Sequence, residues 1–303
     1  MNDSLADLIR LACQAEVLAR KQGNVHPQAS FSDLTATDFL RAAEIVGPIL
    51  ARSAELGIGR AVFEAVRATR DQVATNANLG ICLLLAPCAA AAKQGGDLRP
   101  AIQRVLENLT VDDSRWAYEA IRLATPGGLG QSDQQDVSNE PTVTLIEAMK
   151  LAADRDGVAR QYATAFSDIF DIGLSTIAYF ANFGIEPSII GIHLRLMALR
   201  PDTLIARKCG QSIARESADR ADQVLDSDWP ESAQELANLD TWLRADGHRR
   251  NPGTTADLVA ATLLIALQQR VLDPRTVHDW CTQSIKAFSD TPAPTASDSH
   301  RAH

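Results

Sequence analysis

Helical periodicity runs through almost the whole chain and constrains its fold more than any other feature. Apolar residues recur every three or four positions, and no series of short segments alternates between apolar and polar residues as strands would. The spacing predicts helices over residues 3–22, 35–56, 58–74, 76–93, 98–108, 112–125, 142–153, 155–182, 187–199, 202–226, 230–246, 255–271 and 274–289. We therefore expect an all-α fold.

Polar residues at three predicted helix starts support this fold class. Asp228 with Glu231, and Thr254 with Asp257, have the spacing of a capping box. Asp273 is followed by a proline, which suits an N-cap and the first helical position. We expect each of these three sites to begin a helix.

The length of the chain bears on its division into domains. With 303 residues, it could form one large helical domain or two tightly fused ones. We expect a single multi-helical domain over residues 1–289, followed by a disordered tail over residues 290–303. A polar loop at residues 131–141, QSDQQDVSNEP, is a candidate mobile lid.

Charge and composition limit the possible functions. The net charge of −9 argues against a protein that binds nucleic acid, because phosphates require a basic face. The five cysteines form no CxxC pair, so we expect reduced and mostly buried thiols.

The same sequence gives no sign of export or of membrane insertion. The first residues lack the features of a signal peptide. The most apolar run, residues 79–92, is shorter than the roughly 18 residues of a membrane span and contains Pro87. We therefore predict a cytoplasmic protein with no membrane segment, in which this run is a buried core helix.

Four polar groups interrupt the helical pattern, and the first two join predicted helices. RKQGNV at residues 20–25, followed by FSDL at residues 31–34, forms either an ordinary helix C-cap or a basic turn that binds a ligand. DQVATNANLG at residues 71–80 places Asp71 and Asn78 on one face if its helix is continuous. If the helix breaks, Thr75 or Asn76 becomes the next N-cap, and the free N–H groups there suit a phosphate or carboxylate.

The other two groups lie in the second half of the chain. On a helix over residues 155–182, Asp156, Arg160 and Asp168 fall on one face. That face is either a solvated stripe, with Asp156 and Arg160 as an i,i+4 pair, or a set of carboxylates that holds Mg²⁺ near phosphates. RRNPGTTAD at residues 249–257 is either a basic loop with a cap or a phosphate site at a helix start.

Together these groups resemble the triphosphoribosyl-dephospho-CoA synthase family. The matching segments are RKQGNV, FSDL, TNANLGI, EAMKLAADRD and NPGTTADL, and they extend from near Glu16 to about Leu267. The resemblance implies an all-helical transferase that takes ATP and 3′-dephospho-coenzyme A. An enzyme of this family joins the ribose 5-triphosphate part of ATP to the second substrate and releases adenine.

The resemblance also implies roles for individual residues. Phosphate and nucleotide contacts fall to Lys21, Asn76, Asn78, Gly80, Arg160, Arg249, Arg250 and Thr254. The catalytic carboxylates are expected to be Asp71, Asp156 and Asp168, and the ligands of Mg²⁺ to be Asp33, Asp71 and Asp156. The expected partners are ATP and a second anionic small molecule similar to dephospho-CoA.

The sequence departs from the branch of the family that serves citrate lyase and malonate decarboxylase. Phe31 stands where that branch has a histidine, and Asn78 with Leu79 stands where it has a His-Lys pair. The chain is more similar to a divergent branch found in organisms with methanopterin-linked one-carbon metabolism. A related transferase in the synthesis of a methanopterin- or methanofuran-type cofactor, and a non-catalytic helical nucleotide-binding protein, are the alternative functions.

Overall fold

The computed structural model describes residues 4–73, 78–126 and 134–290, and these ranges contain helices and two isolated β-bridges but no β-strand. The predicted all-α class is confirmed. The first half of the chain forms α1 (Leu5–Leu18), α2 (Ala36–Leu50), α3 (Ser53–Leu56), α4 (Ile58–Arg70), α5 (Leu79–Ala92), α6 (Leu98–Glu107), α7 (Val111–Ala124) and α8 (Leu145–Ala152). The second half forms α9 (Gly157–Ala163), the π-helix η1 (Asp168–Gly173), α10 (Leu174–Phe180), the 3₁₀ turn η2 (Ala181–Phe183), α11 (Ile185–Leu199), α12 (Thr203–Cys209), α13 (Gln211–Leu225), α14 (Gln234–Arg244), α15 (Gly253–Gln268) and α16 (Pro274–Ser289).

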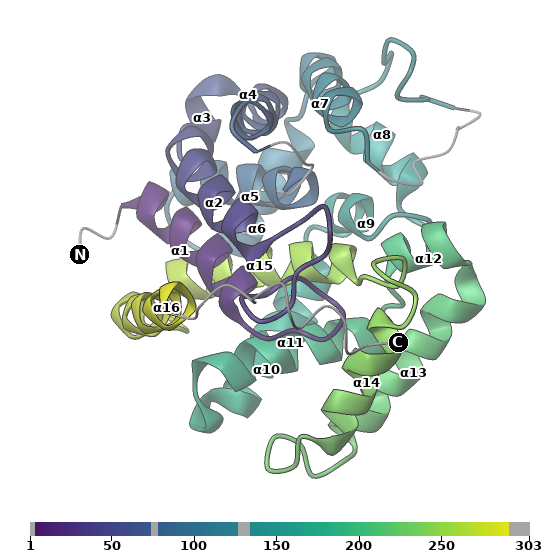
Figure 1. Cartoon of the computed structure of the whole chain (residues 1–303). Helices are drawn as coiled ribbons and strands as arrows, with labels where there is room; N and C mark the ends of the chain where they lie inside the picture. The colour runs from purple at the N-terminus through teal and green to yellow at the C-terminus, as the bar shows by residue number, and fades with distance from the viewer. Residues whose placement is uncertain (1–3, 74–77, 127–133, 291–303) are drawn as a thin grey trace.

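Two apolar helices, α5 and α15, lie at the centre of the molecule and pack against each other (Figure 1). All residues of α15 except Gly253, Asp257 and Gln268 are buried, and α5 is buried apart from Gly80 and Ala92. A helix that is apolar on every side is stable only when other helices surround it. Here α1, α2, α4, α6, α9 and α11 supply that cover, so the predicted buried core helix over the apolar run is confirmed.

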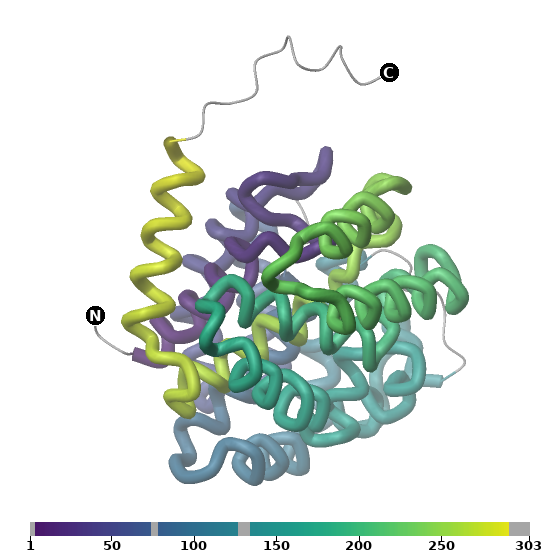
Figure 2. The backbone as a smooth tube through the Cα atoms, turned by 90° about the horizontal axis from the view of Figure 1, so that it is seen from below, coloured from purple at the N-terminus to yellow at the C-terminus, as the bar shows by residue number. Residues whose placement is uncertain are grey.

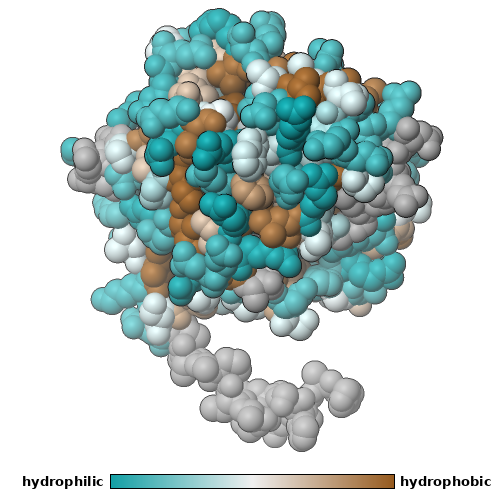
Figure 3. Space-filling view, turned by 90° about the horizontal axis from the view of Figure 1, so that it is seen from above, coloured by the Kyte–Doolittle hydropathy of each residue, from teal (hydrophilic) through white to brown (hydrophobic). Residues whose placement is uncertain are grey.

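The remaining helices lie around this centre. α16 lies along one flank of the molecule and packs against α1 (Figure 2). A smaller apolar cluster, with Phe180, Leu194 and Trp229 among its members, forms where α13 packs against α11 and α14. On the face seen in Figure 3, hydrophilic residues surround smaller apolar groups. The expected tail from residue 291 onward lies outside the described residues, as do residues 131–133 of the expected lid.

Three long predicted helices are wrong, because each is interrupted in the structure. The helix expected over residues 35–56 divides into α2 and α3. The helix expected over residues 155–182 divides into α9, η1 and α10, since Ala165 and Phe166 have φ values of 49° and 62°. The helix expected over residues 202–226 divides into α12 and α13 at Gly210, where φ is 92°. A positive φ ends an α-helix, and glycine adopts it without steric cost.

The predicted caps have mixed outcomes. Asp273 caps α16 as expected, since its side chain accepts a hydrogen bond from the Thr276 backbone N–H. The two capping boxes are wrong. Asp228 lies in a turn before α14, which begins at Gln234, and α15 begins two residues earlier than expected with Pro252 at its N-cap.

Two further expectations concern the cysteines and the membrane. All five cysteines are free, and four of them are buried. Among the described residues, no helix is both long enough and apolar enough to cross a membrane.

Candidate active site

The two central helices, α5 and α15, begin close to each other. The N-terminal ends of α9 and α12 lie at the same place. The Gly157 backbone N–H of α9 donates to the Thr203 hydroxyl of α12 over 3.0 Å, and that hydroxyl donates to Thr254 of α15 over 3.2 Å. Gly80, in the first turn of α5, touches the Asp257 carboxylate of α15. We call this region the helix-start cluster. Helix N-termini carry unpaired N–H groups and partial positive charge, so they favour anions.

Two carboxylates of the helix-start cluster serve as caps. Asp202 caps α12 with one oxygen and accepts from the Thr255 backbone N–H and hydroxyl with the other, at 2.7 and 2.8 Å. Asp156 caps α9 with Oδ1, and its Oδ2 pairs with Arg207 at 2.6 Å. Because the oxygens of both groups are occupied, the predicted catalytic and metal roles of Asp156 require that existing bonds break.

Asp257 is the exception, because its carboxylate accepts no hydrogen bond and forms no ion pair with any residue that the structure describes. It lies on α15 and is partly accessible, although the helix around it is buried. A Cβ atom at Gly80 would lie 2.0 Å from Oδ2 of Asp257, so only glycine leaves room for this carboxylate. An unpaired carboxylate in a largely apolar core is costly, which points to a functional role.

The surroundings of Asp257 disfavour its charged form. Burial raises its pKa well above the ordinary value, and the negative charges of Glu16, Asp202 and Asp156 raise it further. Arg207 acts in the opposite direction. The Nε atom of Arg207 is buried and has no hydrogen-bond partner within the described part of the chain. The site therefore has a carboxylate and a guanidinium that are both incompletely paired.

Most of the basic turn after α1 is buried, although Arg20 at its start is exposed. Lys21 is fully buried, which changes its expected role. Its ammonium pairs with the Glu16 carboxylate over 2.9 Å and also donates to the Glu16 carbonyl oxygen. Burial raises the pKa of Glu16, and the charge of Lys21 opposes that effect. Lys21 thus neutralises a buried carboxylate next to the helix-start cluster, and its predicted phosphate contact would need a different arrangement.

α4 ends at Arg70 and α5 begins at Leu79, so the interpretation with one continuous helix is wrong. The expected N-cap at Thr75 or Asn76 is wrong as well. Asn78 is the N-cap of α5, but its side chain makes no capping bond. Its amide instead donates to the Thr69 hydroxyl of α4 over 3.1 Å, which holds the end of α4 beside the start of α5. Asn76 lies outside the described residues. Gly80 leaves room for a close approach, and the group that approaches it in the structure is Asp257.

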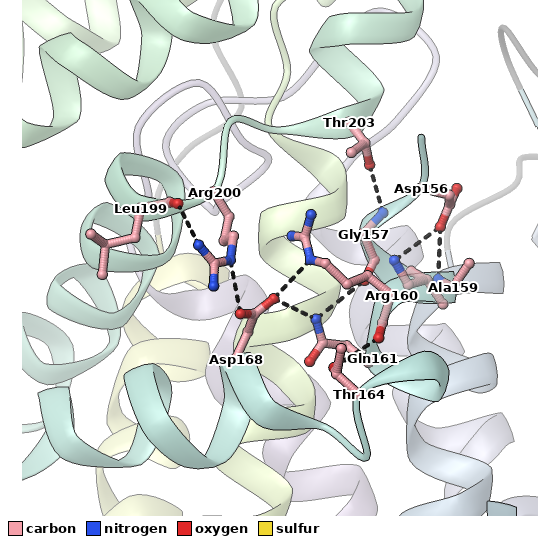
Figure 4. Close-up of polar contacts among 11 residues, drawn as sticks. Asp156, Gly157, Ala159, Arg160, Gln161, Thr164, Asp168, Leu199, Arg200 and Thr203 are labelled. Atoms are coloured by element: carbon pink, nitrogen blue, oxygen red, sulfur yellow. Dashed lines mark hydrogen bonds and ion pairs between the residues drawn. The ribbon is translucent and has the colours of Figure 1, made fainter. Parts of the chain in front are cut away.

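Asp168 is buried and fully occupied (Figure 4). Its two oxygens accept from Arg160 at 3.0 Å, Arg200 at 2.9 Å and Gln161 at 2.8 Å. The predicted Asp156–Arg160 pair is wrong, because α9 ends before residue 168 and Arg160 turns to Asp168 instead. Burial would raise the pKa of Asp168, but the Gln161 hydrogen bond and the two arginines outweigh it and hold that pKa below its ordinary value.

The basic loop before α15 lies at the edge of the molecule. Arg249 pairs with Asp246 at 3.2 Å and is largely exposed, while Arg250 stacks over the Trp242 ring at 4.4 Å. Asp33 is exposed and lies 3.2 Å from His248. These groups are accessible to a ligand.

The predicted metal ligands do not form a preformed metal centre. Within residues 4–73, 78–126 and 134–290, no three His, Cys, Asp or Glu side chains are grouped to hold an ion. Asp71 is the C-cap of α4 and is exposed, so it is free to bind a metal that arrives with a phosphate. Asp33 contacts His248, and Asp156 contacts Arg207.

Sequence reasoning missed Asp257, Glu16, Asp202 and Arg207 as site residues. Asp257 stands in the NPGTTADL segment that carried the family resemblance, but its spacing from Thr254 was interpreted as a capping box. The useful signal was an aspartate that stands near the start of a helix, directly before the apolar run LVAATLLIAL. Glu16 lay in a predicted helix and gave no signal that it would be buried.

Comparison with known proteins agrees with this architecture. A crystal structure from Archaeoglobus fulgidus, provisionally described as a triphosphoribosyl-dephospho-CoA synthase, is similar with a TM-score of 0.61 and 26% sequence identity. The match covers 76% of this chain and 98% of the archaeal one. No curated protein gives a significant match. The sequence profile of the CitG family, described as ATP:dephospho-CoA triphosphoribosyl transferase, matches residues 2–275, and the chain belongs to that transferase family.

Proposed function

We propose that this protein transfers the ribose 5-triphosphate part of ATP to 3′-dephospho-CoA, with release of adenine, and that it does so in the cytoplasm at the helix-start cluster. Family membership over residues 2–275 supports the reaction. The incompletely paired Asp257 supports the location, because a carboxylate without a partner among the described residues is available to a substrate.

Asp257 is proposed as the carboxylate that stabilises the reacting ribose. The C1′–N9 bond of ATP breaks, a C1′–O bond forms to a hydroxyl of the acceptor, and the hydroxyl proton ends on adenine. Positive charge develops on the ribose ring in an oxocarbenium-like transition state. That charge favours the ionised form of Asp257, which burial disfavours in the ligand-free protein, and the ionised carboxylate stabilises the ribose in turn. The apolar walls of α5 and α15 strengthen this attraction because they exclude water.

The phosphates of both substrates need cationic groups and N–H donors. The first turn of α5 at Asn78 and Gly80, and the side chain of Arg207, are the proposed donors within the cluster. Arg249 and Arg250 lie in the loop that leads into α15, and both side chains are at least partly exposed, so they are proposed to contact the more distant phosphates. Lys21 is reassigned from phosphate binding to neutralisation of Glu16.

Magnesium enters the proposal with ATP. Mg²⁺ in such sites is held by one or two carboxylates together with phosphate oxygens and water, and when bound it neutralises phosphate charge. Asp71 fits this requirement, because it is exposed and the Asn78–Thr69 hydrogen bond keeps the end of α4 beside the start of α5. Asp156 fits less well because its oxygens are occupied.

Mass spectrometry of the products tests the reaction. The purified protein is incubated with ATP·Mg²⁺ and 3′-dephospho-CoA, and we expect free adenine together with an acceptor whose mass has increased by one triphosphoribosyl group. ADP or AMP without adenine would instead indicate phosphoryl or adenylyl transfer. No turnover with any acceptor, together with measurable ATP binding, would favour a non-catalytic nucleotide-binding protein.

The acceptor is the part of the proposal that the sequence departures affect most. Phe31 and Leu79 replace residues that are polar or charged in the branch serving citrate lyase and malonate decarboxylase. Leucine cannot supply the charge of a lysine to a phosphate. A pterin- or furan-type precursor in one-carbon cofactor synthesis is therefore the second candidate acceptor, and adenine release that depends on such a compound would identify it.

A further inference from the structure

Two arginines from different parts of the chain share one buried carboxylate. Arg160 of α9 and Arg200, directly after α11, both donate through Nε to Asp168 of η1, at 3.0 and 2.9 Å (Figure 4). The Asp168 side chain is 2% exposed, whereas those of Arg160 and Arg200 are 25% and 45% exposed. We call these three residues the Arg-Asp-Arg group.

This geometry leaves the outer donors of both arginines available. Each guanidinium uses its Nε atom for Asp168, and Nη1 of Arg200 donates to the Leu199 carbonyl oxygen over 3.1 Å. Both Nη atoms of Arg160 and Nη2 of Arg200 have no hydrogen-bond partner within the described ranges. One carboxylate between two guanidiniums also leaves one net positive charge.

Asp168 fixes the orientation of these donors. Its third hydrogen bond comes from the buried Gln161 amide over 2.8 Å. The carboxylate is therefore fixed by a buried group, and it in turn fixes two arginines that are partly exposed. The π-helix supports this position, since it begins at Asp168, one residue after the left-handed pair Ala165 and Phe166. Arginines fixed in this way lose little side-chain entropy when they bind a planar or tetrahedral anion.

Arg160 also lies next to the helix-start cluster. Nη2 of Arg160 is 3.8 Å from the position that a Cβ atom of Gly157 would occupy. That same position is 2.8 Å from the Thr254 methyl group and 3.5 Å from the Thr203 hydroxyl. The free edge of Arg160 is therefore beside the starts of α9, α12 and α15.

We propose that Arg160 and Arg200 form a phosphate-binding subsite, with Asp168 as the positioning residue. The ligand is a phosphate group of one of the two nucleotide substrates, either the triphosphate of ATP or the diphosphate of dephospho-CoA. This inference rests on the proposed function for the identity of the ligand, but anion binding by the two arginines can be measured without turnover. It replaces the predicted catalytic role of Asp168 by a positioning role.

Calorimetric titration tests the subsite. Inorganic tripolyphosphate, ATP·Mg²⁺ and dephospho-CoA are titrated separately into the wild type, Arg160→Gln, Arg200→Gln and the double variant. Arg99→Gln is the matched control, because Arg99 is 46% exposed and pairs with Asp171 in the same π-helix. Thermal unfolding is measured in parallel for every variant.

We expect each single substitution at the subsite to weaken binding of one of these ligands about tenfold, and the double substitution to weaken it more. The salt dependence of binding should also become shallower, while Arg99→Gln leaves affinity unchanged. Loss that is confined to tripolyphosphate and ATP assigns the subsite to the triphosphate, and loss that is confined to dephospho-CoA assigns it to the diphosphate.

Equal affinities in the wild type and the double variant for all three ligands would overturn the subsite, and would leave the two arginines with a structural role only. A fall in melting temperature without any change in affinity would lead to the same conclusion. Failure of the proposed function is distinguishable, because absence of adenine release in the wild type leaves the tripolyphosphate titration intact as a test.

Discussion

At the scale of single residues, the contact between Gly80 and Asp257 connects the packing of the core to the proposed chemistry. Asp257 is an acidic residue in a helix whose neighbouring positions are all buried. It remains there without a hydrogen bond from the described residues because glycine on α5 leaves space for it. Such an arrangement reduces stability, and enzymes retain it where a substrate supplies the missing partner.

Asp257→Asn should therefore increase the stability of the ligand-free protein. Because the folded-state pKa is raised, the carboxylate destabilises the fold at pH values above its unfolded pKa of about 3.9, and an uncharged amide of the same size avoids that cost. We expect the free energy of unfolding at pH 7 to rise by about 0.5–2 kcal/mol.

Urea unfolding at several pH values measures this difference. The gain of Asp257→Asn over the wild type should shrink as the pH falls through about 4 and should vanish below about pH 3, where the carboxyl group is protonated in both states. A variant that is less stable than the wild type at pH 7 would show that Asp257 has a stabilising partner.

Gly80→Ala should affect function more than stability. The new methyl group would lie 2.0 Å from Oδ2 of Asp257, so the carboxylate must move away from its present position. Alanine is a better helix former than glycine by about 1 kcal/mol, which offsets part of the cost.

A double-mutant cycle separates these two effects. With Asp257→Ala in the background, Gly80→Ala should stabilise the protein by about 1 kcal/mol, since the clash is absent. In the wild-type background, adenine release should fall while the stability changes less. The same stabilisation in both backgrounds would contradict the contact.

At the scale of elements, the segment from α9 to α10 shows why some features could not be predicted. Its sequence has helical periodicity throughout, so the helix content was predicted correctly. The break at Ala165 and Phe166 was missed because neither residue favours a positive φ, and only tertiary contacts hold them there. The break directs Arg160 to Asp168 and not to the exposed stripe that a continuous helix would have formed.

Asp168→Asn should destabilise the protein at neutral pH. Since the folded-state pKa of Asp168 is lowered, its stabilisation is present above the unfolded pKa and is lost as the pH falls through the folded pKa. Loss of the charged hydrogen bonds should cost about 1.5–3 kcal/mol at pH 7.

The matched control is Asp171→Asn, which removes the exposed partner of Arg99 in the same π-helix. An exposed ion pair is worth about 0–1 kcal/mol, so this variant should remain close to the wild type. The deficit of Asp168→Asn should diminish in unfolding experiments below about pH 4. A deficit that is constant down to pH 2 would mean that the charge of Asp168 does not contribute.

At the scale of the whole molecule, the sequence predicted the fold class and the buried apolar helix, because both follow from local periodicity. The site was predicted only in part. Asn78, Gly80 and Thr254 lie near the meeting point of four helix starts. The ion pairs of Asp33, Asp156 and Lys21 could not be predicted, because they depend on how the chain folds. Asp257 was missed because an unpaired carboxylate is recognisable only after its surroundings are known.

Adenine release by the wild type and by Asp257→Asn, measured with ATP·Mg²⁺ and 3′-dephospho-CoA, tests the central claim most directly. Asp273→Asn is the control, since Asp273 caps α16, beyond the far end of α15, and asparagine is an equally good cap. We expect release by the wild type and the control, and a loss of roughly 10²–10³-fold in Asp257→Asn with its fold intact. Adenine release at the wild-type rate in Asp257→Asn would contradict the assignment of the reaction to the helix-start cluster.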